Sequence, residues 1–130
     1  MKLSYFSEQY KTWMKVNSIT FERKLENETA FDGIVKIYSL KCSLESVSQM
    51  LNGNFFGEFS YSTETGILLR MFTTKYSWPK STLIYIDLIN FKLTEIDSNN
   101  SSWLFWKVKD LKCGKYSVQI SPSQIIQFQT

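Results

Sequence analysis

Cationic and aromatic side chains alternate near the end of the chain, and this pattern has the clearest chemical meaning in the sequence. Four lysines are interleaved with four aromatic residues: Lys107, Lys109, Lys112 and Lys115 with Trp103, Phe105, Trp106 and Tyr116. On a β-surface, rings that stack on bases and ammonium groups that meet phosphates hold single-stranded nucleic acid. However, a folded hairpin needs part of these rings for its core, and lysine is ordinary on strand edges.

The same stretch also predicts a surface for protein association. Trp103 and Phe105 fall on the strand face opposite to Leu104, and Trp78 lies in a separate segment beside Pro79. An exposed aromatic patch with a polar rim commonly binds another protein, and sometimes stacks on a sugar. The candidate partner-binding residues are therefore Trp78, Trp103, Phe105, Lys107, Lys109, Lys112 and Lys115.

Catalytic and cofactor chemistry has little support. The chain has no histidine, which removes His-dependent triads and nearly all zinc and copper sites. Its five glycines match neither a phosphate-binding loop nor a dinucleotide fingerprint. Two carboxylates can act as acid and nucleophile, but Glu58 and Glu95 occupy polar positions of alternating runs, which indicates a solvated sheet face. Asp87, inside an apolar run, is expected to have a structural role. We expect no enzyme activity, cofactor or metal.

A β-hairpin predicted over residues 103–120 would position the candidate residues. Two alternating runs flank a short loop that contains Gly114, and one face carries the apolar residues Leu104, Trp106, Val108, Tyr116, Val118 and Ile120. Residues 110–120 resemble the last-hairpin pattern Leu-x-x-Gly-x-Tyr-x-Val of many β-sandwich modules, with Cys113 where proline is frequent. This resemblance implies a fold class and no particular function.

The remaining elements are predicted from periodicity. Alternating or continuously apolar runs predict strands at 19–24, 34–40, 55–61, 67–73 and 83–89, the last continuing to 96. The segment 62–66 ends in glycine and predicts a hairpin loop, whereas 97–102 predicts an irregular loop. Apolar spacings of three and four predict short helices over 3–15 and 43–51. Ser121, Pro122 and Gln124 form a capping box that predicts a third over 121–128.

Length and composition set the class. A chain of 130 residues with 16% aromatic residues favours one β-rich domain over 1–130. We expect a mainly β fold, an antiparallel sandwich or half-open barrel with two or three short helices. Without an apolar run typical of a signal peptide or a membrane span, we expect a soluble, cytoplasmic protein. In that compartment Cys42 and Cys113 are expected to be thiols.

These expectations favour a non-enzymatic protein that binds another protein. Within that class the sequence favours an inhibitor or immunity protein that occludes the active site of a bacterial toxin, because such proteins are small, soluble and cofactor-free. The net charge of +3 disfavours fast association with a basic nuclease. The alternatives are a single-stranded nucleic-acid-binding domain that uses the 103–120 hairpin, and a carbohydrate-binding sandwich that uses Trp78 or Trp103.

Overall fold

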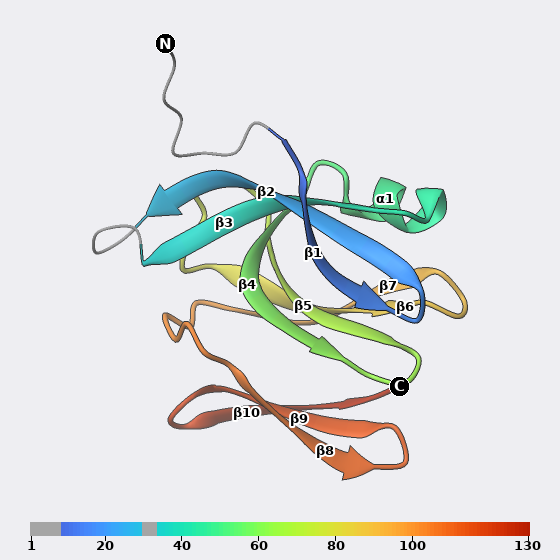
Figure 1. The fold of residues 1–130 in the computed structure, drawn as a ribbon. Coiled ribbons are helices and arrows are strands. Elements are labelled where there is room, and N and C mark those ends of the chain that lie inside the picture. Colours follow the sequence, from blue (N-terminus) through green and yellow to red (C-terminus); the bar gives the residue numbers. More distant parts are fainter. Residues whose placement is uncertain (1–8, 30–33) are drawn as a thin grey trace.

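Two antiparallel sheets and one short helix make up the part of the chain that the computed structural model describes, residues 9–29 and 34–130 (Figure 1). The larger sheet contains seven strands in chain order: β1 (Lys11–Val16), β2 (Ile19–Thr29), β3 (Val35–Cys42), β4 (Phe55–Ser62), β5 (Gly66–Phe72), β6 (Ser81–Asp87) and β7 (Lys92–Asn99). Helix α1 (Glu45–Leu51) joins β3 to β4. The smaller sheet contains β8 (Lys107–Lys112), β9 (Lys115–Ser121) and β10 (Gln124–Gln129), with β9 in the centre.

All neighbouring strands run antiparallel, which confirms the expected mainly β fold with antiparallel sheets. The hairpin predicted from residues 55–61 and 67–73 is present as β4 and β5, with Tyr61 opposite Leu68. The described helix α1 is not long and apolar enough to cross a membrane, and no other described segment is helical.

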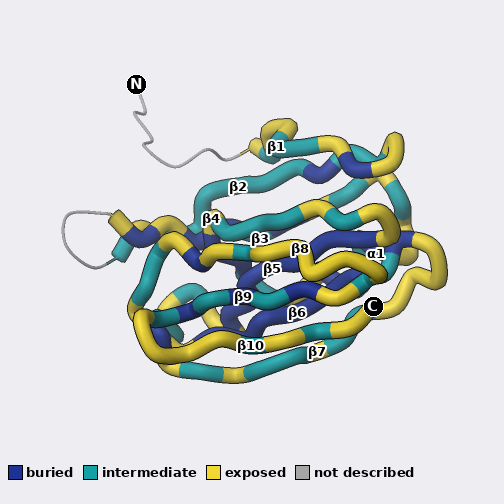
Figure 2. The backbone as a smooth tube through the Cα atoms, turned by 90° about the horizontal axis from the view of Figure 1, so that it is seen from below, coloured by how far each residue is buried: buried dark blue, intermediate teal, exposed yellow. Residues whose placement is uncertain are grey.

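Strands β5 and β6 separate two apolar cores. Every residue of β5 is buried, and successive side chains point to opposite faces of the sheet. On one face, Ile67 and Leu69 pack with Phe21 of β2 and Leu51 of α1. On the other face, Leu68 packs against the smaller sheet. Figure 2 shows the buried backbone running along β5 and β6 between the more exposed outer strands.

The smaller sheet covers the second of these faces. Val118 and Ile120 of β9 are almost fully buried and belong to one cluster with Leu68 and Leu83. The rings of Phe128 in β10 and Tyr85 in β6 lie with their centroids 5.1 Å apart. Figure 1 shows β8, β9 and β10 lying beneath β4 and β5 in that view. The predicted core face of the hairpin is therefore confirmed for Trp106, Tyr116, Val118 and Ile120, all of which are buried.

Two of the three predicted helices are wrong over the described residues. Residues 11–15 of the predicted first helix belong to β1, and its residues 3–8 lie outside the described residues. The predicted third helix is a tight turn followed by β10. Pro122 and Ser123 form the turn, and Ile125, Ile126 and Phe128 are residue types that favour strands. The middle helix is confirmed as α1, although it begins at Glu45 and not at Ser43.

Strand boundaries differ from prediction in two places. The run from 83 to 96 is broken by a turn at 88–91, so that it forms the β6–β7 hairpin. The predicted loop at 97–102 is partly strand, because Asp97, Ser98 and Asn99 pair with the beginning of β6. In the last hairpin, β8 begins only at Lys107, and residues 100–106 form an irregular connector between the two sheets.

Candidate functional site

A cleft of ≈ 440 Å³ opens between the larger sheet and the connector that leads into the smaller one. Its walls come from the start of β3, from β4 and β5, from Trp78, and from the connector and β8. Two of the exposed large apolar side chains lie at it, Phe105 at 81% exposure and Ile34 at 55%. The further lining residues are Val35, Lys36, Gly57, Glu58, Phe59, Ser60, Tyr61, Arg70, Phe72, Trp78, Leu104, Trp106 and Val108.

Arg70 of β5 is the buried charge of this cleft, with 3% of its surface exposed. Its guanidinium donates hydrogen bonds to four neutral oxygens. Nε binds Ser81 Oγ at 2.7 Å, and Nη1 binds the carbonyl of Trp103 at 2.7 Å. Nη2 binds the carbonyls of Pro79 at 3.3 Å and Ser101 at 2.6 Å. The side chain therefore links β5 to the beginning of β6 and to the connector.

Three aromatic rings surround the same guanidinium. Its central carbon lies 4.2 Å from the ring centroid of Trp106, 4.8 Å from that of Trp78 and 5.4 Å from that of Phe72. The ring faces carry negative quadrupole density and stabilise a desolvated cation. No described carboxylate forms an ion pair with Arg70. Burial without a counter-ion lowers the pKa of Arg70 to about 10, so the group remains charged at neutral pH.

The hydrogen bonds of Arg70 fix the connector, and the connector forms one wall of the cleft. Ser101 is buried and its hydroxyl donates to the carbonyl of Ile120 in β9, which ties the connector to the smaller sheet as well. The two carbonyls of the connector that Arg70 binds, those of Ser101 and Trp103, both precede Phe105 in the chain. Arg70 is thus a positioning residue, because it attaches the beginning of the segment that carries Phe105 to the larger sheet.

Trp106 contributes an unpaired donor beside the cleft. Its ring lies against Phe59, with centroids 5.5 Å apart, and only 6% of the residue is exposed. Its indole nitrogen is buried without a hydrogen-bond acceptor among the described residues. A buried N–H group without an acceptor costs about 1–3 kcal/mol. Such unpaired buried donors are uncommon in folded proteins, and this one belongs to a residue of the cleft lining.

The structure brings two of the predicted aromatic site residues together and separates the third. Trp78 and Phe105 both line the cleft. Trp78 is half-buried, with its ring 6.3 Å from that of Phe72. Trp103 does not line the cleft. It packs on the core between the sheets, and its carbonyl serves Arg70.

The four predicted lysines lie away from the cleft. Lys107 and Lys109 alternate along β8 with the half-buried Val108, so they project from the outer face of the smaller sheet. Lys112 and Lys115 are opposite each other at the end of the β8–β9 hairpin. All four are exposed. On the other two strands their cross-strand neighbours are Ser117, Gln119, Gln127 and Gln129, and not aromatic rings.

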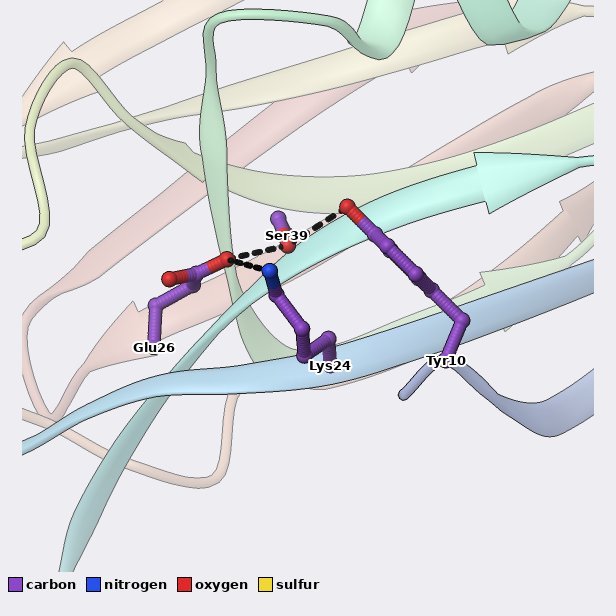
Figure 3. A network of polar contacts seen from close by, with 4 residues as sticks. All are labelled: Tyr10, Lys24, Glu26 and Ser39. Carbon is purple, nitrogen blue, oxygen red and sulfur yellow. Dashed lines mark hydrogen bonds and ion pairs between the residues drawn. The ribbon is translucent and has the colours of Figure 1, made fainter. Parts of the chain in front are cut away.

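A separate polar network lies on β2 and β3 (Figure 3). The Ser39 hydroxyl donates to Glu26 Oε2 at 2.6 Å, and the Lys24 ammonium lies 3.4 Å from the same oxygen. The Tyr10 and Ser39 hydroxyls are 3.0 Å apart. A serine beside a lysine and a carboxylate can act as a nucleophile when a substrate can reach it. Ser39 is not among the residues that line the cleft, so we assign it no such role. We interpret this network as a structural attachment of Tyr10 to the sheet.

The carboxylates considered for catalysis remain apart from the cleft, with the exception of Glu58. Glu58 is exposed on β4 at the cleft, and Lys36 lies in the same lining. The carboxylate of Asp87 instead accepts hydrogen bonds from the backbone N–H groups of Ile89 and Asn90. No group of three histidine, cysteine, aspartate or glutamate residues in the described part of the chain could hold a metal ion. Cys42 and Cys113 are both free thiols.

Arg70 is the site residue that the sequence analysis missed. One signal was available, because Arg70 is the single charged residue in the otherwise apolar strand β5. Such a residue must be exposed at an edge or buried with partners. The partners come from residues 79, 81, 101 and 103, so their identity depends on how β6 and the connector pack and not on local spacing.

No protein-family model matches the chain, and no curated protein or solved structure is significantly similar to it. The functional interpretation therefore depends on the geometry of the cleft and on the chemistry of its lining.

Proposed function

We propose that this chain is a non-enzymatic protein-binding module, and that it binds its partner through the cleft and the exposed Phe105 ring. The single observation that carries the proposal is Phe105, which is 81% exposed beside an aromatic-lined cleft. Aromatic side chains at the centre of a contact supply much of the affinity of protein interfaces. The cleft offers space for an apolar side chain of the partner, while Phe105 would enter the partner's own surface.

Support for a pre-formed binding surface comes from the way the connector is held. Loops that must become ordered on binding lose affinity because of the conformational entropy of ordering. The connector around Phe105 is instead fixed by hydrogen bonds between Arg70 and the carbonyls of Ser101 and Trp103. This rigidity favours recognition of one partner over adaptable binding of many.

The specific form of the proposal is an inhibitor or immunity protein that covers the active site of a bacterial toxin, in the bacterial cytoplasm. The lining of the cleft is rich in aromatic and apolar side chains, and its exposed charged residues are Lys36 and Glu58. The larger architecture proposed with it is a β-sandwich, in which the smaller sheet covers the β5–β6 face. The exposed lysines of the smaller sheet favour an acidic partner surface, because opposite charges accelerate encounter.

Binding of single-stranded nucleic acid is the second candidate, and the four exposed lysines favour it. Against it, the rings that alternate with these lysines in the sequence face the core, as Trp106 and Tyr116 do. Stacking on rings contributes much of the affinity in this kind of binding. A carbohydrate-binding role depends on Trp78, whose ring is already packed against Phe72 and the Arg70 guanidinium.

A matched pair of phenylalanine variants tests the proposal. Each protein encoded next to its gene is co-expressed with the chain, and for any that is toxic when expressed alone, growth and the affinity of the purified proteins for each other are measured. Phe105→Ser is expected to weaken binding at least about thirtyfold, the effect of losing an interface hot spot. Phe91→Ser provides the control, because Phe91 is also exposed, at 44%, but lies in the β6–β7 turn.

Two results would contradict the proposal. One is unchanged affinity and growth protection in the Phe105→Ser variant. The other is the absence of any protein partner together with oligonucleotide binding that weakens steeply with salt, which would establish the nucleic-acid candidate instead.

A further inference from the structure

Strand β10 differs from the other three strands that form the edges of the sheets. An edge strand presents unpaired backbone N–H and C=O groups, and charged side chains normally prevent it from pairing with another chain. β1 carries two lysines, β7 carries Lys92, Glu95 and Asp97, and β8 carries three lysines and Asp110. The sequence of β10, Gln-Ile-Ile-Gln-Phe-Gln, has no charge. By this criterion β10 is the unprotected edge.

The geometry of β10 also suits the addition of a strand. Its pairing with β9 is regular from Ile125 to Gln129, and the register shifts only before Ile125. In contrast, the edge strand β8 has an irregularity between Asp110 and Lys112. Ile125 is 63% exposed, and Gln127 and Gln129 are exposed. No described strand pairs with the open side of β10 (Figure 1).

We propose that β10 pairs with β10 of a second copy of this chain, antiparallel about a twofold axis, so that the two smaller sheets become one continuous sheet. Each copy has a net charge of +3, and the outer face of its smaller sheet carries four lysines on β8 and β9. Two copies therefore meet with least repulsion at a strand without charge. A neutral strand is also complementary to itself, as a twofold interface requires.

The faces of the sheet restrict the register to those that differ by two residues, and among them we propose the one in which Ile126 lies opposite Phe128 of the second copy. Residues opposite each other in an antiparallel pair must lie on the same face, because a slip by one residue exposes the apolar set. Ile126 and Phe128 face the core between the sheets, and Gln127 lies on the outer face. The register that keeps Ile126 opposite Phe128 of the second copy places Gln127 opposite Gln127. The twofold axis then passes between the two Gln127 side chains.

This register gives a sharp test, because one substitution changes both sides of the axis. We expect the wild-type chain to reach twice its chain mass in sedimentation equilibrium as its concentration rises from low micromolar to about 1 mM. Gln127→Lys places two like charges opposite each other, and we expect the dimer dissociation constant to rise at least about fivefold. Gln127→Glu is expected to have the same effect. An equimolar mixture of the two variants is expected to form a heterodimer at least as stable as the wild type.

A control variant separates the edge from the overall charge. Gln49→Lys makes the same substitution at an exposed position of α1, far from the edge in sequence and in the fold. It is expected to leave dimerisation unchanged. A wild-type chain that stays monomeric up to the highest concentration overturns the proposal. So does a dimer that Gln127→Lys does not weaken, or a mixture of the Gln127→Lys and Gln127→Glu variants that remains monomeric. None of these results depends on the toxin partner.

Discussion

At the scale of single residues, Arg70 is the side chain on which the candidate site depends. A buried cation without an acidic partner is expensive, and the cost of its desolvation is offset here by four neutral acceptors and three ring faces. A guanidinium suits this task because it is planar and presents five donors in fixed directions. The acceptors come from segments distant in sequence, so one side chain orders a substantial part of the fold.

Replacing Arg70 by lysine is therefore expected to be strongly destabilising. A single ammonium group has three donors, and it cannot reach Ser81 together with the carbonyls of residues 79, 101 and 103. Left unpaired and buried, these carbonyls cost about 1–3 kcal/mol each, and we expect a loss of about 3 kcal/mol in the free energy of unfolding. Urea denaturation followed by tryptophan fluorescence measures this loss.

The only other arginine in the sequence, Arg23, provides the control for this measurement. It is half-buried on β2, with its guanidinium carbon 4.2 Å from the Tyr38 ring centroid and 5.0 Å from that of Trp13. Arg23→Lys retains a cation near these rings and is expected to cost less than about 1 kcal/mol. Equal losses for the two variants would show that Arg70 has no special structural role.

At the scale of elements, the β6–β7 turn shows how a carboxylate shapes the fold. The turn contains no glycine, and Phe91 adopts a positive φ of 56°. Asp87 stabilises it, because its carboxylate accepts hydrogen bonds from the backbone of Ile89 and Asn90 at 2.8 and 3.0 Å. The side-chain amide of Asn90 donates to the second oxygen at 3.1 Å. These hydrogen bonds make Asp87 a residue that organises the turn.

The charge of Asp87 gives the stability a pH dependence that can be measured. Its hydrogen bonds, first of all that from the Asn90 backbone N–H, lower the pKa of the carboxyl below its ordinary value. A lowered pKa in the folded state means that the stabilisation is fully present above the unfolded-state pKa of about 4, and is lost as the pH falls through the folded-state pKa. We expect the Asp87→Asn variant to have a lower free energy of unfolding than the wild type at pH 7. We expect this difference to decrease as the pH falls and the Asp87 carboxylate of the wild type becomes protonated.

Urea denaturation of both proteins between pH 7 and pH 2 tests this dependence. The amide side chain of the Asp87→Asn variant keeps an acceptor oxygen but carries no charge, so the comparison isolates the ionised form. A gap in unfolding free energy that stays constant across this range would mean that the carboxylate charge does not stabilise the turn.

The elements that the sequence predicted correctly are those with strong local signals. The β4–β5 hairpin has clear alternation and a polar loop that ends in Gly66. An added Cβ at Gly66 would collide with the backbone carbonyl of Ile86, so glycine is required there. The wrong helices had ambiguous signals, because Pro122 begins a helix as readily as it occupies a turn. The turn after Asp87 was missed because it has neither glycine nor proline.

At the scale of the whole molecule, the site exists only where two sheets meet. The candidate residues Phe105 and Trp78 were predicted from their positions in the sequence, Phe105 opposite Leu104 in a predicted strand and Trp78 beside Pro79. The cleft between them was not, since it requires Arg70 to hold the connector against the larger sheet. The sequence also did not predict that the lysines and the aromatic rings lie on opposite faces of the smaller sheet. This arrangement depends on which face of the smaller sheet packs on Leu68 and Tyr85.

The expected single domain predicts that both sheets unfold together. Ile67 lies in the core on the α1 side of β5, and Ile120 lies in the core between the two sheets. The exposed fraction of each residue is 1% or less. Because adjacent residues of β5 contribute to both cores, loss of one core exposes the other.

Ile67→Val and Ile120→Val are each expected to lower the unfolding free energy by about 1 kcal/mol. Each should shift one common urea transition, the same by far-UV circular dichroism and by tryptophan fluorescence. Two of the four tryptophans, Trp103 and Trp106, pack in one cluster with the smaller sheet. A transition for Ile120→Val that moves only in fluorescence would instead establish that sheet as a separate unit.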